Sequence, residues 1–330
     1  MATLIATALS ASGLRPVNLK TDLAPLADLM EIAFAESMDS SGRAAIREMR
    51  TLSRLGSGVN LLSGVNDLVL GIGLGYVWLE DGKLIGNVSI YPSNLPSHLP
   101  RSWVIANVAV HPDYRGRGIA RRLMEASLEA IGHRGDILLQ VEERNEIARN
   151  LYTSLNFHEE GTFTIWRRPG SAHKPPLLPQ QSAHITRRTR GEWEEELELA
   201  RRSRAGGYDV GWLRPIDAHY FRKSLLKSLL DIFSLRSDER LIIRSEQDRR
   251  LLASLWIERA FGSSTTRLTL LVEEDYAALH GETMLSSVCR RFEGETLSIE
   301  HPTHDAIITF LLQRLMFQPQ RTLVHMRHRA

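Results

Sequence analysis

The alternation of apolar and polar residues predicts mixed strands and helices in the first half of the chain. A hairpin is the clearest element, because Asp81-Gly82 separates two alternating runs, Gly75–Leu79 and Leu84–Tyr91. Both faces of the next run, Trp103–Val110, are mostly apolar, which predicts a strand at the centre of a sheet. The other elements expected in this half are strands at Leu14–Leu19, Asp136–Val141 and Thr162–Arg167 and helices at Leu23–Phe34, Arg43–Leu55, Arg117–Ile131 and Glu146–Leu155.

The second half repeats the order of elements seen in the first. It begins with a charged helix at Glu192–Arg204. The order strand, strand, helix, strand, helix, strand then follows, at Leu251–Phe261, Arg267–Val272, Glu282–Phe292, Thr296–Glu300, His304–Phe317 and Arg321–Met326. Because Gly75–Arg167 has the same order, we interpret the chain as a diverged duplication of one α/β fold.

A proline-rich segment separates the two halves. Gly170–Ala183 contains three prolines and no apolar period, so it cannot form a regular element. The chain has 330 residues, more than the roughly 250–300 at which single cores stop growing. We therefore expect one domain over residues 1–169, a linker over 170–183 and a second domain over 184–330.

Composition and charge narrow the classes of function. Hydrophobic residues make up 43% and charged residues 24%, the balance of a globular protein rather than a disordered one. The net charge is only +2 and both signs interleave, so no nucleic-acid surface is predicted. No apolar run reaches the roughly 20 residues of a membrane span, and Met1–Gly13 lacks the basic residues of a signal peptide. A single cysteine, Cys289, excludes an internal disulfide and favours a reducing compartment, so we expect a cytoplasmic protein.

One segment has a pattern that points to specific chemistry. Residues 108–120 read VAVHPDYRGRGIA and run from the expected central strand through a glycine turn into a helix. Gly116 and Gly118 let the backbone approach a ligand without an intervening Cβ. Amides of the turn and of the helix start face one spot, where the helix dipole favours negative charge. We interpret the turn as a pyrophosphate cradle, flanked by the positive side chains of Arg115, Arg117, Arg121 and Arg122.

This segment resembles the acyl-CoA-binding loop of the GNAT superfamily of N-acetyltransferases. The family signature Arg/Gln-x-x-Gly-x-Gly/Ala is matched by Arg115, Gly118 and Ala120. Downstream, Asn145–Phe157 (NEIARNLYTSLNF) resembles the second family motif, with Asn156 in place of the usual glycine. The resemblance implies two GNAT-like α/β domains, each a mixed, mostly antiparallel twisted sheet with helices on both faces. The second domain, which has neither motif, is expected to be degenerate.

The resemblance also implies roles for individual residues. In the family, the strand equivalent to Trp103–Val110 splays from the next strand and pantetheine binds in the gap. A backbone N–H near Val108 or Ala109 would stabilise the oxyanion, and Tyr152 matches the tyrosine that protonates the departing thiolate. Asn145 matches an asparagine that contacts the cofactor, although a helix cap is an equal alternative. The expected cofactor-binding set is Val108, Ala109, Val110, Arg115, Gly116, Arg117, Gly118, Ile119, Ala120, Arg121, Asn145 and Ala148.

The implied function is transfer of an acetyl group from acetyl-CoA to a primary amine by direct attack, without a metal. The acceptor is expected to be a small-molecule amine or a peptide amino terminus, and the second domain to shape its pocket or a homodimer interface. Trp103–Val110 contains no carboxylate to act as general base. The role of general base remains open to Glu80, to Asp81 or to a chain of water molecules, and no base is needed if the amine arrives neutral. A non-catalytic acyl-CoA sensor or interaction protein is the alternative function.

Other distinctive residues have structural explanations. The Gly71–Gly75 segment, GIGLG, lacks the dinucleotide-binding spacing and is expected to lead into a strand. His325 and His328 are expected in a solvated C-terminal end. Cys289 falls on a helical apolar pattern, which predicts a buried structural thiol.

Overall fold

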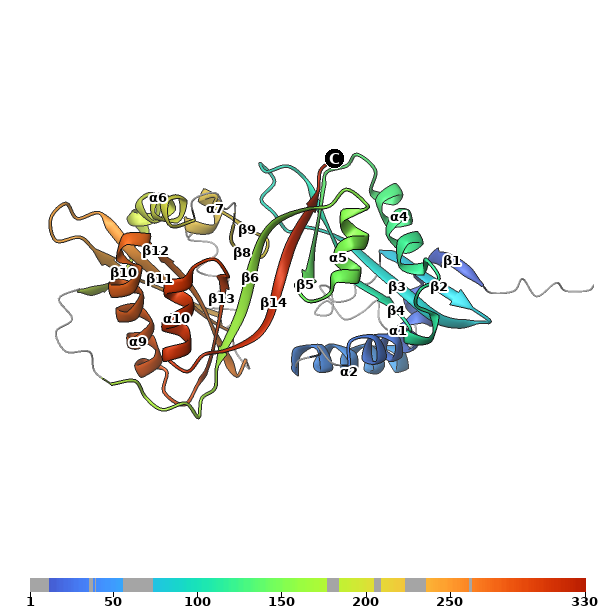
Figure 1. Ribbon diagram of the computed structural model, residues 1–330, viewed down its shortest axis with the longest axis horizontal. Coiled ribbons are helices and arrows are strands. Elements are labelled where there is room, and N and C mark those ends of the chain that lie inside the picture. Colours follow the sequence, from blue (N-terminus) through green and yellow to red (C-terminus); the bar gives the residue numbers. More distant parts are fainter. Residues whose placement is uncertain are drawn as a thin grey trace, which may run out of the picture. The chain divides into compact units, whose positions relative to one another are not determined.

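The computed structural model describes the protein as two compact units (Figure 1). Unit 1 comprises Met1–Leu139, Asn150–His158 and Arg327–Ala330, and unit 2 comprises Gln140–Arg149 and Glu159–Met326. The residues that the structure describes are 12–35, 38, 40–55, 74–176, 184–204, 209–222, 236–260 and 263–330.

Unit 1 is a sheet with helices on both faces. Its strands, in sheet order, are β1 (Gly13–Pro16), β2 (Gly75–Glu80), β3 (Lys83–Pro92), β4 (Ser102–Val110) and the start of β5 (Asp136–Glu142). Its helices are α1 (Leu19–Ala33), α2 (Ser40–Leu55), α4 (Ile119–Ile131) and the end of α5 (Glu146–Thr153). All pairings are antiparallel except that of β4 with β5, which is parallel.

The two faces of the unit 1 sheet are covered by different helices. On one face Leu26 and Leu29 of α1 are buried with Val77 of β2. On the other face α4 lies so close to β3 that a Cβ on Gly86 would be 3.1 Å from side-chain atoms of both Ile119 and Leu123. The absence of a side chain at Gly86 therefore fixes the first turns of α4 against the sheet.

Unit 2 is built from the same kinds of layer. Its main strands, in sheet order, are β14 (Gln318–His328), β6 (His158–Arg168), β13 (Thr296–Pro302), β12 (Thr265–Val272), β11 (Leu251–Ala260), β10 (Arg236–Arg244) and β7 (Ile185–Arg187). Its helices are α6 (Trp193–Ser203), α7 (Ala218–Phe221), α9 (Glu282–Arg291) and α10 (Ala306–Arg314). A separate hairpin joins β8 (Asp209–Gly211) to β9 (Arg214–Pro215).

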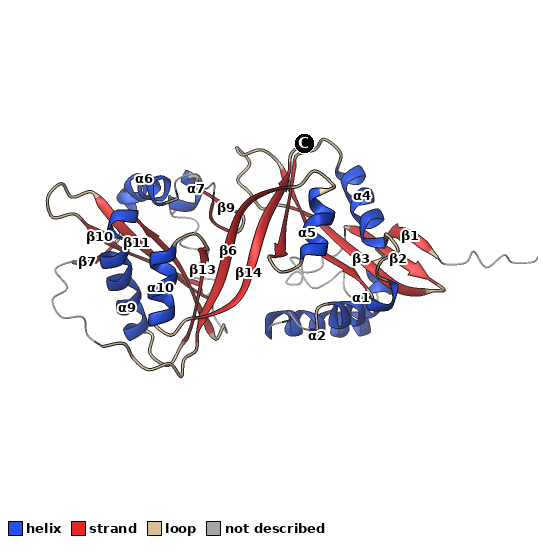
Figure 2. Cartoon of the chain, in the orientation of Figure 1, coloured by secondary structure: helices blue, strands red, loops and turns tan. Residues whose placement is uncertain are grey.

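Figure 2 distinguishes the helices of unit 2 from the strands of its sheet, and two apolar clusters hold these layers together. Residues of α9 and α10, including Leu285 and Leu312, pack against one face of the sheet. Residues of α6, including Leu199, pack against the other face beside Trp256 and Leu271. Both units thus have the α/β architecture with helices on two faces that the sequence predicts.

The closing strand of each half does not stay within that half. β6 lies between β14 and β13, and its Trp166 is 5% exposed and belongs to the core of unit 2. β14 lies between β5 and β6, and its end enters unit 1, where Arg327 Nη1 is 3.0 Å from Asp136 Oδ2. The observed units therefore differ from the boundaries expected at residues 169 and 184. An alternating pattern identifies a strand but does not identify its sheet neighbours.

The individual elements agree closely with the sequence pattern. The hairpin of β2 and β3, the central strand β4 and helices α4, α5, α9 and α10 occur where they are expected. Strand β10 is an addition to the predicted set. Of the expected linker, residues 177–183 lie outside the described residues, as do Gly71 and Gly73.

The expectation of a solvated C-terminal end is wrong for His325. Its side chain is 4% exposed within β14. The ring stacks on Phe163, with centroids 4.5 Å apart, and its Nε2 is 2.9 Å from Nε2 of Gln140. The arginines near His325 in the sequence made this segment look exposed, but consecutive residues of β14 are buried, so both sides of the strand are covered there.

Replacing Trp166 by alanine tests the placement of β6. We expect Trp166→Ala to lower the free energy of unfolding by about 3–5 kcal/mol, because a large buried side chain is removed from the core of unit 2. The neighbouring exposed residue supplies the control, and Arg167→Ala should change stability by less than about 0.5 kcal/mol. Urea denaturation measures both, and equal effects of the two variants would contradict the placement.

Candidate active site

The site begins where β4 and β5 stop pairing. Their parallel ladder contains three pairs and ends with Val104 opposite Leu138. From Ile105 to Val110, β4 continues without a β5 partner in the described structure. Backbone groups on this side of β4 need other hydrogen-bond partners, which an extended amide-containing ligand can supply. The splay expected beside Val108 is therefore present in unit 1.

A β-bulge lies in the same stretch of β4. On β3, Asn87 pairs with Ala109 and Ser89 pairs with Ala106, so Val88 faces both Asn107 and Val108. Asn107 accordingly has a left-handed φ of 53°. Asparagine tolerates this conformation better than most residues, and a bulge of this kind redirects the backbone groups around it.

The glycine turn follows β4 directly. A short 3₁₀ turn at Pro112–Tyr114 leads to Gly116 and Gly118, which have φ values of 78° and 75° and are exposed. Gly118 is the N-cap of α4 and supplies no side-chain hydrogen bond, and Arg122 N–H donates to its carbonyl at 3.1 Å. The N–H groups of the first helical turn are therefore left without intrahelical acceptors, as an anion site at a helix start requires.

The arginines of the turn make contacts within the protein. Arg115 Nε donates to the Val110 carbonyl at 3.2 Å, so this backbone group is already occupied. Arg117 Nη1 lies 2.9 Å from Glu80 Oε1. Arg121 Nη2 donates to Ser154 Oγ at 2.7 Å, which ties the start of α4 to the residues after α5.

Tyr152 lies on α5 and is almost completely buried. Its side chain is 6% exposed, and its ring is tilted against that of Phe157 at a centroid distance of 6.0 Å. Burial raises the pKa of Tyr152 to about 12. The phenol therefore stays protonated at neutral pH and keeps its O–H as a hydrogen-bond donor. Asn156, in place of the family glycine, has a φ of 62°, so the turn after α5 is retained.

Asn145 caps α5. Its Oδ1 accepts from Ala148 N–H at 3.1 Å, and its carbonyl accepts from Arg149 N–H at 3.0 Å. Of the two interpretations that the sequence left open, the helix cap is therefore present. A cofactor contact by Asn145 or Ala148, both in the segment assigned to unit 2, stays a prediction.

Neither of the two acidic candidates for the general base, Glu80 and Asp81, lies on β4. β4 contains no carboxylate, and the Glu80 carboxylate is engaged by Arg117 beside the glycine turn rather than beside the bulge. Asp81 lies in the β2–β3 turn next to Glu80, with a φ of 50°. Neither acidic residue is thus placed along the splayed part of β4.

In unit 2 the corresponding strands also separate, but an arginine side chain occupies a backbone group beside the gap. β12 and β13 stop pairing at Leu268 opposite Ile299, and two residues later the Leu270 carbonyl accepts from Arg204 Nη2 at 3.1 Å. Burial lowers the pKa of Arg204 to about 10. The Arg204 guanidinium thus hydrogen-bonds to the Leu270 carbonyl, a backbone group that a ligand amide would otherwise bind.

The two motif elements also change in unit 2. A π-helical segment, Ala277–Gly281, leads directly into α9 in place of a glycine turn. After α10, Phe317 N–H donates to the Leu312 carbonyl at 2.9 Å, just as Phe157 N–H donates to the Tyr152 carbonyl at 3.1 Å. Leu312 therefore stands where unit 1 has its tyrosine, and it carries no proton to donate.

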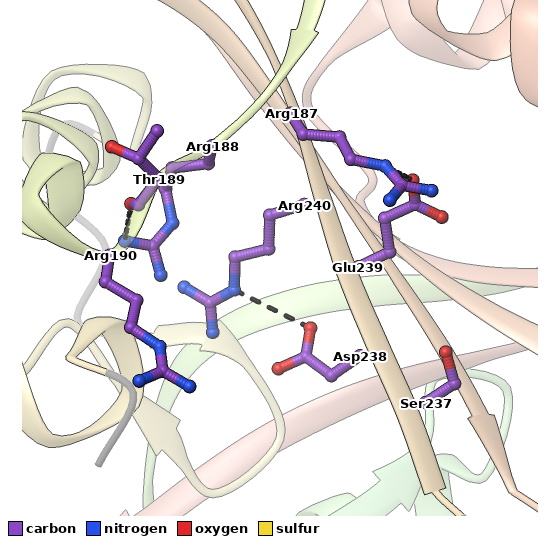
Figure 3. Close-up of a pocket in the computed structure, with 8 residues that line it drawn as sticks. All are labelled: Arg187, Arg188, Thr189, Arg190, Ser237, Asp238, Glu239 and Arg240. Carbon is purple, nitrogen blue, oxygen red and sulfur yellow. Dashed lines mark hydrogen bonds and ion pairs between the residues drawn. The ribbon is translucent and has the colours of Figure 1, made fainter. Parts of the chain in front are cut away.

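A cavity in unit 2 has an arginine-rich lining but paired charges. It measures about 280 Å³, and Figure 3 shows its eight lining residues around β10. The carboxylate of Glu196, which is fully buried, lies 2.7 Å from Arg240 Nη1 and 3.0 Å from Arg188 Nε. Arg187 Nε lies 2.7 Å from Glu239 Oε1. Arg188 and Arg240 thus form a buried ion-pair cluster with Glu196, whereas the pair of Arg187 with Glu239 lies at the surface. Because these charges are paired within the protein, the lining does not indicate an anion site.

Other chemistry has little support in the described part of the chain. No group of three or more His, Cys, Asp or Glu side chains there is arranged to hold a metal ion. None of the described helices has the length and apolar character needed to cross a membrane. Cys289 is fully buried in α9, and burial raises the pKa of its thiol to about 12, as expected of a structural cysteine.

Comparison with known proteins agrees with this geometry. Residues 67–157 match the acetyltransferase (GNAT) family. N-alpha-acetyltransferase 30 of Schizosaccharomyces pombe is 36% identical over 84 residues, which are 25% of this chain and 55% of that protein. Peptidyl-lysine N-acetyltransferase YiaC of Escherichia coli is 33% identical over 94 residues, 28% of this chain and 56% of that protein. The chain thus spans about half the length of these curated relatives.

Solved structures extend the likeness of fold to the whole chain. A GCN5-related N-acetyltransferase from Sphaerobacter thermophilus has a TM-score of 0.62 and 12% identity, covering 96% of this chain and 95% of that one. A tandem GNAT protein from the clavulanic acid biosynthesis pathway has a TM-score of 0.53 and 14% identity, covering 96% and 98%. At these identities the comparison shows the fold, and it shows it for both halves.

Titration of Tyr152 tests the environment of its phenol. The absorbance difference between the wild type and Tyr152→Phe should stay flat through pH 10, and tyrosinate should appear only near pH 12. Since the unfolded phenol ionises near pH 10, the folded state should also lose stability as the pH rises above 10. Tyr276→Phe serves as a control, and a Tyr152 signal near pH 10 would contradict the assigned burial.

Proposed function

We propose that the chain is an acyl-CoA-dependent N-acetyltransferase, because residues 67–157 match the acetyltransferase (GNAT) family and the whole chain has a fold similar to that of a tandem GNAT protein. It transfers an acetyl group from acetyl-CoA to a primary amine by direct attack within a ternary complex. Unit 1 performs the reaction, and unit 2 is a degenerate copy that binds no acetyl-CoA.

One observation carries the proposal. The ladder between β4 and β5 ends at Val104, and the same strand then runs into Gly116 and Gly118, whose left-handed turn opens the first turn of α4. A strand with free backbone groups and a helix start with free N–H groups suit the two parts of coenzyme A, its amide-containing arm and its pyrophosphate.

Each part of unit 1 then has a task. Val108 and Ala109 hold the arm through their backbone, and a backbone N–H at Val108 stabilises the oxyanion, a contribution of about 3–4 kcal/mol in other acyl transfers. Residues Gly116–Arg121 hold the pyrophosphate through amides, while Arg115 and Arg117 add positive charge. Tyr152 donates a proton to the departing thiolate. Since its pKa is about 12, it acts as a protonated donor at neutral pH.

The acceptor is a small-molecule amine or a peptide amino terminus. The relatives named above are described as acting on protein alpha-amino groups and on peptidyl-lysine, which supports an amine acceptor. A reducing compartment, the cytoplasm, suits the single cysteine. The second candidate function is a non-catalytic acyl-CoA sensor, and the lack of a carboxylate on β4 favours it.

Blocking the glycine turn tests acetyl-CoA binding. Isothermal titration of the wild type should show one site per chain, and Gly118→Val should weaken binding more than about 100-fold, because a branched residue cannot adopt a φ of 75° there without moving the helix start. Gly294→Val is the matched control, since Gly294 has a φ of 84° and equally open surroundings in unit 2. Two sites, or equal affinities of the variants, would contradict the assignment.

A panel of amines separates the enzyme from the sensor. We expect release of CoA with at least one amine from a set of small amines, amino acids and peptides with free amino termini. Tyr152→Phe should then lower kcat about 100-fold with little change in the affinity for acetyl-CoA, because only the donated proton is lost. Tyr276→Phe should keep full turnover. Acetyl-CoA binding without CoA release from any amine would favour the sensor.

A further inference from the structure

A buried amide side chain holds the bulge of β4 in place. Nδ2 of Asn87 donates to the carbonyl oxygen of Asn107 at 2.9 Å, across 20 residues of sequence. Asn87 is 2% exposed, so solvent does not compete for this hydrogen bond. Gly86 faces α4, and the alternation of β3 therefore directs Asn87 to the opposite face, the one covered by α1.

A second polar contact holds the other part of the bulge. The exposed Asn107 has its Nδ2 3.2 Å from Ser89 Oγ, and Ser89 is 1% exposed. The Asn87 amide also lies 3.5 Å from the same hydroxyl. Of these contacts, only the one from Asn87 to the Asn107 carbonyl acts on a backbone group of β4.

That carbonyl belongs to the peptide unit that joins Asn107 to Val108. The described chain has no cis peptide bonds, and in a trans peptide the C=O and the N–H point in opposite directions. With the Asn107 carbonyl turned toward Asn87, the N–H of Val108 points away from Asn87. Val108 lies four residues beyond the last β4–β5 pair, where β4 lacks a β5 partner.

We propose that Asn87 is a positioning residue for acyl transfer: by holding the Asn107 carbonyl, it aims the Val108 N–H at the thioester oxygen. The inference rests on the proposed function and deepens it. Asn87 touches neither substrate, and it acts through the backbone of the bulge. Without its hydrogen bond, the orientation of the Asn107–Val108 peptide is less firmly fixed, because the contact of the Asn107 side chain with Ser89 does not hold that carbonyl.

The thioester carbonyl itself reports this hydrogen bond. A donated N–H weakens a C=O bond and lowers its stretching frequency, so infrared spectra of acetyl-CoA labelled with ¹³C at the thioester carbonyl measure it without any acceptor amine. We expect a lowered frequency on the wild type. Asn87→Asp keeps the size of the side chain but cannot donate when ionised, so it should return the frequency toward that of free acetyl-CoA. Acidification that protonates the new carboxyl should restore the lowering.

Two further variants separate positioning from folding. Asn87→Ala should match ionised Asn87→Asp, and Ser89→Ala, which alters the same buried cluster but not the carbonyl contact, should keep the wild-type frequency. With an amine that the wild type acetylates, Asn87→Asp should lower kcat about 10- to 100-fold while the Kd for acetyl-CoA changes less than about threefold. Thermal melts record the folded state of each variant.

The outcomes distinguish the two levels of the hypothesis. An unchanged carbonyl frequency in ionised Asn87→Asp with acetyl-CoA bound overturns the role of Asn87 and leaves the proposed function standing. A wild type that binds no acetyl-CoA overturns the proposed function, and the role of Asn87 with it. If Ser89→Ala abolishes the lowering of the carbonyl frequency as fully as ionised Asn87→Asp does, the effect comes from the packing of the cluster, and the positioning role is overturned.

Discussion

The short ladder between β4 and β5 is the constraint on which unit 1 depends. Three pairs, ending at Val104 and Leu138, hold the strands together at one end. Beyond them, the backbone N–H and C=O groups of β4 that face β5 have no strand partner. Buried backbone groups rarely lack a hydrogen-bond partner. The bulge at Asn107 redirects the strand, and Gly86 allows α4 to lie against β3 so that the helix start is fixed beside the strand end. The arrangement consists almost entirely of main-chain groups, which suits the acetyl-CoA site that we propose.

Unit 2 has the same frame of strands and helices with different residues at the corresponding positions. Its strands also separate, after Leu268, yet Arg204 occupies the Leu270 carbonyl and Leu312 replaces a tyrosine. The turn that follows the strand is helical instead of glycine-rich. These differences support the proposal that unit 2 binds no acetyl-CoA. The fold therefore accommodates either an open gap between the separated strands or one occupied by a side chain, and a few residues determine which of the two occurs.

Local features could be predicted from the sequence, whereas features that depend on distant neighbours could not. Asp81-Gly82 and the apolar run of β4 specify a hairpin and a central strand through short-range pattern alone. The left-handed turn at Gly118 follows from residue type. In contrast, the burial of His325 and the exchange of β6 depend on which strands become neighbours, which periodicity does not encode.

The candidate site divides in the same way. The glycine turn and Tyr152 are visible through their motifs, and the cap at Asn145 is visible through its residue type. Asn87 belongs to no motif, because its importance comes from a hydrogen bond to a backbone atom 20 residues away. An asparagine within an apolar strand run is the feature that could have drawn attention to it, since a buried amide must find partners.

The exchange of closing strands also has a consequence for synthesis of the protein. β6 precedes α9 and α10 in the sequence but belongs to the core around them. Unit 2 therefore cannot complete its sheet until β13 and these two helices have also been synthesised. The pairing of β6 with β13 joins residues that are far apart in the sequence, and such long-range pairing forms slowly compared with local pairing.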